Sequence, residues 1–165
     1  MKSSAISLAL LLGVTTAGAA DEDALSTYQL LTPATAMEIS QAALKACNDA
    51  GYQVAVTVVD RMGVAQVMIR DRFAGPHTPD TSARKAWTAV SFRTDTLSMS
   101  DATKAGTAQA GARFIANALM IGGGVPITAG GAIVAGIGVS GAPGGAQDDA
   151  CARAGIDAVQ EKLEF

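Results

Sequence analysis

Histidine and cysteine are scarce in this chain, which has one histidine, His77, and two cysteines, Cys47 and Cys151. A structural zinc site takes about four histidine or cysteine ligands, so these residues do not suffice for one. A hydrolytic triad would depend on His77 as its base, but the chain has no Gly-x-Ser-x-Gly segment to present a serine nucleophile. The shortage argues against structural zinc and against triad-based hydrolysis.

Aromatic residues and positive charge are also in short supply. Aromatic side chains make up 4% of the chain, and 12 lysines and arginines stand against 15 aspartates and glutamates, for a formal net charge of −3. Nucleic-acid-binding proteins carry basic patches, often with aromatic residues for stacking, so no nucleic-acid partner is expected. With 18 glycines and 5 prolines in a chain that is 49% hydrophobic, disorder is not expected either.

The apolar run near the N-terminus is too short to span a bilayer and has another explanation. Lys2 precedes an apolar core at residues 5–14, small residues follow at 17–20, and an acidic stretch comes next. This order is typical of a secretory signal peptide. We therefore expect residues 1–20 to be a signal peptide and residues 21–165 to form a single domain. The mature protein should be periplasmic or secreted and carry no membrane span.

The first half of the mature chain predicts a helix followed by a hairpin. Thr32 is a favourable N-cap, Pro33 suits the first helical position, and Gly51 ends the apolar helical pattern. Residues 53–71 then have the pattern of two β-branched strands joined by a short turn at residues 60–63. A hairpin implies antiparallel pairing.

The second half predicts helix, strands and helix. A second helix should begin at Thr78-Pro79, with Thr78 as N-cap, and run to about Phe92, followed by a weaker helix within residues 97–105. Strands are expected in residues 112–127 and 131–141, and a final helix in residues 145–163. The fold class predicted from this order is α+β, with a mostly antiparallel sheet, and not a parallel doubly wound fold.

One glycine motif resembles a dinucleotide-binding fingerprint, but its surroundings disagree. Residues 136–141 fit G-x-G-x-x-G after a strand and before a helix. A dinucleotide site also needs a second parallel strand with an acidic end, and the chain finishes in a helix instead. Asp148 and Asp149 at the start of that helix would also repel a pyrophosphate. We therefore interpret the glycines as positions for close packing and a tight exit from the strand.

The segment "DRFAGPHTPDTSARKAW" holds the single histidine and several groups of interest. His77 lies just before the predicted helix, whose positive end disfavours an imidazolium. Arg84 and Lys85 supply cations one to two turns later, and Trp87 supplies a flat apolar surface. An imidazole, two cations and an aromatic ring could together hold a flat, iron-containing ligand with carboxylate tails, and heme has those features.

A simpler interpretation of the same segment stays open. His77 can be a turn residue whose ring bonds the backbone, and Arg84 can pair with Asp80 four residues earlier on the helix. A lone histidine is a weak signal of a site.

Several ordered motifs resemble one known family. "TVVDRMGVAQVMIRDRFAGPHTPDTSARKAWTAVSFRT", "GGGVPI", "GAIVAGIGVSGAP" and "QDDACARAGI" are similar to the GlcG/HbpS family, also called the heme-degrading domain or DUF336 family. The resemblance covers residues 31–158. It implies a profilin-like α/β/α sandwich around a mostly antiparallel sheet of about five strands, a homo-oligomer, and binding of heme or of iron released from it.

The resemblance leaves the activity open, because family members include exported heme or iron binders and accessory proteins of small-molecule utilisation. Our first hypothesis is an exported protein that sequesters or buffers heme, with His77 on the iron and Thr78 sharing the site. Arg84 and Lys85 would pair with the propionates, and Trp87 would contact the ring or the pocket wall.

Two other hypotheses belong to different classes. In one, an enzyme or accessory protein acts on a small organic acid in the same pocket, with His77 as base and Arg84 as carboxylate clamp. In the other, a structural oligomer presents a surface to a membrane sensor or redox partner. We favour a binding protein over an enzyme.

Cys47 and Cys151 have two interpretations. Oxidising compartments allow a disulfide, and in the implied sandwich the terminal helices lie side by side. Cysteine is equally common as a small buried hydrophobe without a partner. In neither interpretation are they a catalytic pair, because neither has a C-x-x-C partner or a nearby base.

Overall fold

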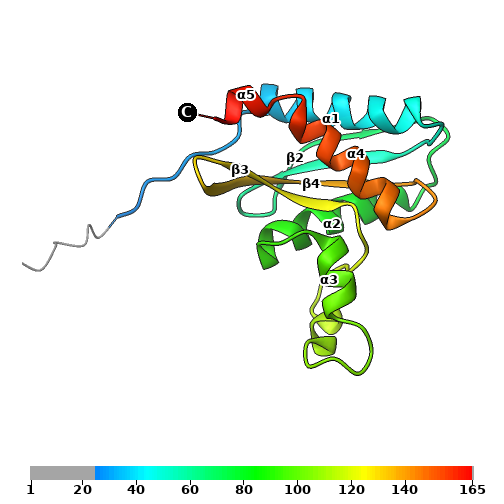
Figure 1. Ribbon diagram of the computed structural model, residues 1–165. Coiled ribbons are helices and arrows are strands. Elements are labelled where there is room, and N and C mark those ends of the chain that lie inside the picture. Colours follow the sequence, from blue (N-terminus) through cyan, green and yellow to red (C-terminus); the bar gives the residue numbers. More distant parts are fainter. Residues whose placement is uncertain (1–24, 165) are drawn as a thin grey trace, which may run out of the picture.

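The computed structural model describes residues 25–164, and the predicted signal peptide, residues 1–20, lies outside that range. The elements follow one another as expected, helix, hairpin, helices, strands and helices (Figure 1). Their bounds are α1 (Pro33–Asp49), β1 (Ala55–Asp60), β2 (Ala65–Arg70), α2 (Thr78–Phe92), α3 (Thr96–Ala102), the 3₁₀ helix η1 (Ala110–Phe114), β3 (Gly124–Ala129), β4 (Ala132–Ser140), α4 (Gly145–Asp157) and α5 (Gln160–Leu163).

The sheet is antiparallel throughout, in the order β2-β1-β4-β3. It has four strands within the described residues, not about five, so the α+β class is confirmed and the strand number is corrected. The strand expected in residues 112–127 begins only at Gly124. Earlier in this segment, the guanidinium of Arg113 donates to the carbonyls of Thr103 and Ser100, next to the end of α3.

Helix starts follow local capping chemistry. The Thr32 hydroxyl accepts from the Thr35 amide at the start of α1, as predicted. At α2 the N-cap is His77, one residue earlier than expected. The Thr78 hydroxyl donates to the Gly75 carbonyl instead of capping the helix. Thr78 is therefore the first residue of α2, and the imidazole of His77 projects from the cap position.

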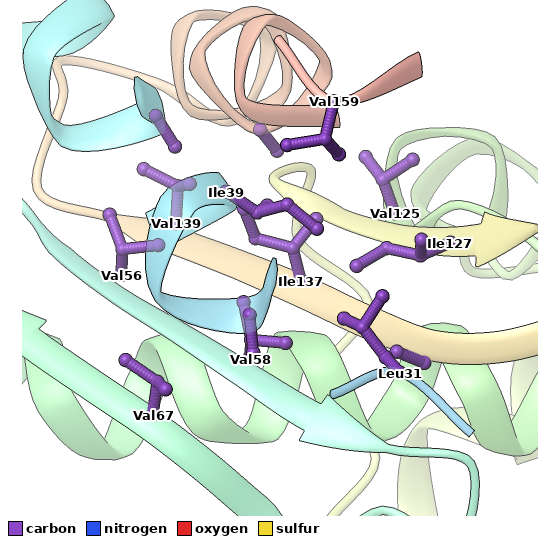
Figure 2. Packing of buried hydrophobic residues seen from close by; sticks show 14 of the residues in the cluster. Leu31, Ile39, Val56, Val58, Val67, Val125, Ile127, Ile137, Val139 and Val159 are labelled. Carbon is purple, nitrogen blue, oxygen red and sulfur yellow. The ribbon is translucent and has the colours of Figure 1, made fainter. Parts of the chain in front are cut away.

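Helices cover both faces of the sheet: α1 and α4 pack on one face and α2 packs on the other (Figure 1). The larger core lies between the sheet and the α1/α4 pair. Figure 2 shows Ile39 of α1 among side chains of the strands, and Ile137 of β4 is fully buried there. A smaller cluster of Val59, Ala86 and Val90 lies under α2.

The glycines of the G-x-G-x-x-G motif allow this close packing. A Cβ on Gly138 would lie 2.0 Å from the Ser82 carbonyl oxygen of α2, and one on Gly136 would lie 2.6 Å from Val90. Gly141, with φ +133°, turns the chain out of β4. The interpretation as packing and exit glycines is confirmed. Because β4 pairs with antiparallel neighbours, the parallel unit of a dinucleotide site is not present in the described residues.

A disulfide joins the two helices of the larger core. Cys47 near the end of α1 is bonded to Cys151 of α4, and their Cα atoms lie 5.5 Å apart. Both cysteines are buried. Of the two sequence-based interpretations, the disulfide is the correct one.

Candidate functional site

A cavity of about 430 Å³ opens where β4 ends, between the beginnings of α2 and α4. This volume lies within the usual range of small-molecule sites. Four stretches of chain line it: the turn before α2, the first two turns of α2, the segment that leads into β3, and the end of β4 with the start of α4. The lining residues are Gly75, His77, Thr78, Thr81, Arg84, Lys85, Leu119, Ile121, Ser140, Gly141, Ala142, Gly144, Gly145 and Asp148.

His77 lies in this lining with an exposed side chain. Its ring packs over Gly75, where an added Cβ would lie 2.7 Å from the ring atom Cε1. The ring makes no cap hydrogen bond to α2. Both ring nitrogens are thus available for a ligand, and the interpretation of His77 as a turn residue whose ring bonds the backbone finds no support in residues 25–164.

Arg84 connects the cavity to the segment before β3. Its guanidinium donates to the carbonyl oxygens of Asn117 at 3.4 Å and Ala118 at 3.2 Å. The expected pair with Asp80 is present at 4.0 Å, and the exposed fractions of the two side chains are 40% and 77%. An ion pair this long and exposed contributes little to stability. Arg84 therefore has donors that a ligand can recruit at modest cost.

Lys85 forms a buried ion pair with Asp148. Its Nζ donates to Asp148 Oδ2 at 2.7 Å and to the Val139 carbonyl at 2.9 Å, and the lysine is 1% exposed. Burial lowers the pKa of Lys85 and raises the pKa of Asp148, while the opposite charge of the partner counteracts each shift. The other oxygen of Asp148 accepts from the Ala142 amide at 3.0 Å. The pair thus ties α2 to α4 and to the turn after β4.

Trp87 lies away from the cavity. Its indole packs on Gly63 in the β1–β2 turn, where a Cβ would lie 2.6 Å from Cδ1. It lines a separate groove of about 180 Å³, and Arg84 borders both spaces. Helix geometry gives the reason, because two residues along a helix rotate a side chain by about 200° relative to Lys85. The structure brings His77, Thr78, Arg84 and Lys85 together and leaves Trp87 apart.

Asp148 and Ser140 are among the cavity residues that the sequence analysis did not predict as site residues. Asp148 was considered only as a charge at the start of a helix that would repel a pyrophosphate, and its partner Lys85 is 63 positions away. Ser140 is 5% exposed and lines the cavity at the end of β4. The strand alternation around the motif glycines was the available signal, because Ser140 follows Gly136 and Gly138 at a spacing of two.

Two further properties bear on chemistry. Within residues 25–164, no group of three or more His, Cys, Asp or Glu side chains could hold a metal ion. Among the same residues, no helix is long and apolar enough to cross a membrane.

Comparison with known proteins decides the family. The family model described as "Haem degrading protein HbpS-like" matches residues 31–157, which is most of the chain. The chain belongs to this HbpS-like family. The resemblance drawn from the sequence motifs is thereby confirmed.

Solved structures agree with this assignment. A double mutant of HbpS from Streptomyces reticuli is 39% identical, with a TM-score of 0.77, over 89% of this chain and 99% of that one. The DUF336 protein ORFY of Klebsiella pneumoniae is 26% identical, with a TM-score of 0.80, over 84% of this chain and 96% of that one. A PduOC:heme complex is 27% identical, with a TM-score of 0.73, over 78% of this chain and 94% of that one. A search of curated proteins found no match.

Proposed function

We propose that this HbpS-like protein binds heme in the cavity between the beginnings of α2 and α4, and that it sequesters or buffers heme. The observation that carries the proposal is the exposed imidazole of His77 at the lining of a ligand-sized cavity. Family membership and the heme complex of the PduOC relative support it. The iron of heme would supply an open coordination position, and a neutral imidazole is a common ligand for it.

The residues of the cavity fit such a ligand. Leu119 and Ile121 provide apolar surface on one side. Arg84, whose hydrogen bonds to backbone carbonyls are long, can turn toward a propionate. Thr78 is 1% exposed, and its hydroxyl already donates to Gly75, so we assign it to support of the turn beneath His77.

Two of the residues expected to contact heme have other contacts. The charge of Lys85 is balanced by Asp148, so Lys85 offers a donor but little net charge. Trp87 packs on the β1–β2 turn, outside the cavity. In our proposal His77 and Arg84 are therefore the principal ligand contacts.

The setting of this function is also part of the proposal. The predicted signal peptide supports export of the protein, and outside the cytoplasm it would hold bound heme for a membrane sensor or redox partner.

A homo-oligomer is supported by exposed apolar side chains such as Phe114, which is 89% exposed, and Ile115, which is 49% exposed. Light scattering at micromolar concentration should give a mass above that of one chain.

The test is a hemin titration of the apo-protein followed by its Soret band. The protein should give a shifted, saturable band, and His77→Ala should change the band position and weaken binding by about tenfold or more, the scale of losing about 1.4 kcal/mol. Phe73→Ala is the control, because Phe73 is 75% exposed on the same loop and does not line the cavity. A Soret change that does not saturate would refute heme binding. A His77→Ala spectrum identical to that of the unaltered protein would show that His77 is not a ligand of the iron.

A further inference from the structure

Ser140 is a nearly buried residue at the cavity, and its hydroxyl has no hydrogen-bond partner among residues 25–164. On β4, Gly136 and Gly138 face α2, and Ile137 and Val139 are fully buried in the larger core. Because side chains alternate along a strand, Ser140 faces the α2 side. Ser140 is 5% exposed, and its hydroxyl makes no hydrogen bond in residues 25–164, although it lines the cavity. A hydroxyl can both donate and accept a hydrogen bond, so this unpaired group at the cavity can bond a ligand atom.

Lys85 presents a second donor to the same cavity. Its ammonium group has three N–H donors, and the Val139 carbonyl and Asp148 take two of them. The third has no partner among the described residues, and Lys85 lines the cavity. Because two strong bonds already hold the ammonium in place, it can donate to a ligand without rearranging.

The beginning of α4 adds backbone donors, and its two carboxylates are each paired with a cation. The first helical bond runs from the Asp148 amide to the Gly144 carbonyl, so the three preceding amides have no partner within the helix, and no side chain caps them. The carboxylates of Asp148 and Asp149 would repel an anion here if they were free. Each is paired, Asp148 with Lys85 at 2.7 Å and Asp149 with Arg153 at 2.6 Å. The repulsion expected from the sequence is therefore reduced in the fold, although the second oxygen of Asp149, Oδ1, has no hydrogen-bond partner.

The charge of the lining selects the class of anion. Arg84 and Lys85 are positive and Asp148 is negative, which leaves one net positive charge around the cavity. A carboxylate balances this charge, whereas a phosphate dianion would exceed it.

We propose that the inner end of the cavity is a carboxylate subsite made by the Ser140 hydroxyl, the Lys85 ammonium and the first amides of α4. This proposal rests on the proposed heme function, and the carboxylate bound at the subsite would be a propionate of heme. The subsite would make a free carboxylate a requirement for tight binding, separate from any bond between His77 and iron.

The test compares hemin with hemin dimethyl ester, which keeps the iron and blocks both carboxylates. The protein should bind hemin about tenfold or more tightly than the ester. In Ser140→Ala this preference should fall by about fivefold, the scale of one net hydrogen bond of about 1 kcal/mol. Ser140→Thr, which keeps the hydroxyl, should retain the preference. Ser91→Ala, at an exposed site on α2 outside the cavity, is the matched control.

If the unaltered protein and Ser140→Ala prefer hemin over the ester by the same factor, the subsite is overturned and heme binding is left intact. If neither porphyrin binds, the proposed function fails and the subsite is tested by sodium propionate alone. Propionate should then raise the melting temperature relative to sodium chloride at equal ionic strength, and Ser140→Ala should remove the increase. No difference between the two salts would overturn the subsite.

Discussion

At the scale of single residues, the most informative contact is that between His77 and Gly75. The imidazole lies where a side chain at position 75 would be, with Cε1 at 2.7 Å and Nδ1 at 2.9 Å from a Cβ built on Gly75. Gly75 has no positive φ, so its role is to leave space and not to relieve backbone strain. The absence of one methyl group thereby sets where the ring lies.

We expect Gly75→Ala to displace the imidazole and leave the fold intact, because only a movable ring would clash with the new Cβ. Hemin affinity should fall and the Soret band should shift toward that of His77→Ala. Gly111→Ala is the control, since Gly111 has no neighbouring atom within 4 Å of an added Cβ and no positive φ. A Gly75→Ala protein indistinguishable from the unaltered one would show that the ring is not held by this contact.

At the scale of elements, the buried pair of Lys85 and Asp148 connects α2 with α4 across the end of β4. The sequence could predict α1, the hairpin and α2, because their signals are local: a threonine cap at Thr32, a turn after Asp60 and a proline at position 79. It misplaced the strand before Gly124, because apolar residues such as Phe114 and Ile115 matched a strand pattern although the fold leaves them exposed. Which apolar run becomes a strand depends on finding a neighbour to pair with.

Lys85→Met should lower the free energy of unfolding by about 3–5 kcal/mol, because it leaves the Asp148 carboxylate buried and unpaired. Replacing both partners, as Lys85→Met with Asp148→Leu, should recover most of that loss, since apolar replacement of a buried pair is often nearly neutral. Urea unfolding measures each variant.

The matched control for this experiment is Lys45→Met. Lys45 pairs with Asp49 at 2.6 Å, but the two side chains are 74% and 65% exposed. Removing that pair should cost less than about 1 kcal/mol. Equal losses for Lys85→Met and Lys45→Met would contradict a structural role for the buried pair.

At the scale of the whole molecule, the disulfide joins the first and last long helices over the same face of the sheet. Its loop spans 104 positions, and α1 and α4 pack on one another along their length. Cross-linking residues this far apart restricts the unfolded chain, which the chain-entropy model values at about 4.7 kcal/mol for a loop of about 100 residues.

Replacing both cysteines by serine should therefore lower the free energy of unfolding by about 2–5 kcal/mol. Denaturant unfolding of the oxidised protein, the reduced protein and the Cys47→Ser/Cys151→Ser variant measures the effect. The reduced protein and the double variant should show similar losses. Thiol titration of the unfolded, unreduced protein should find no free thiol, and two free thiols per chain would contradict the bond.

Features that depend on neighbours along the chain could be predicted from the amino-acid sequence. The helix beginning at Pro33, the hairpin, the α2 helix, the packing glycines and the family motifs were all readable, because capping, turn formation and strand alternation act over a few residues. The sequence also placed His77 beside the start of a helix, which is where the structure has it.

How these elements come together at one site depends on the packing of the folded chain. This packing paired Lys85 with Asp148, bonded Cys47 to Cys151, turned Trp87 away from the cavity and left Ser140 without a partner inside it. Each of these depends on how two elements pack at a particular rotation and distance. Residues far apart in the chain carry no local signal of that arrangement, because it is set by burial of the whole core.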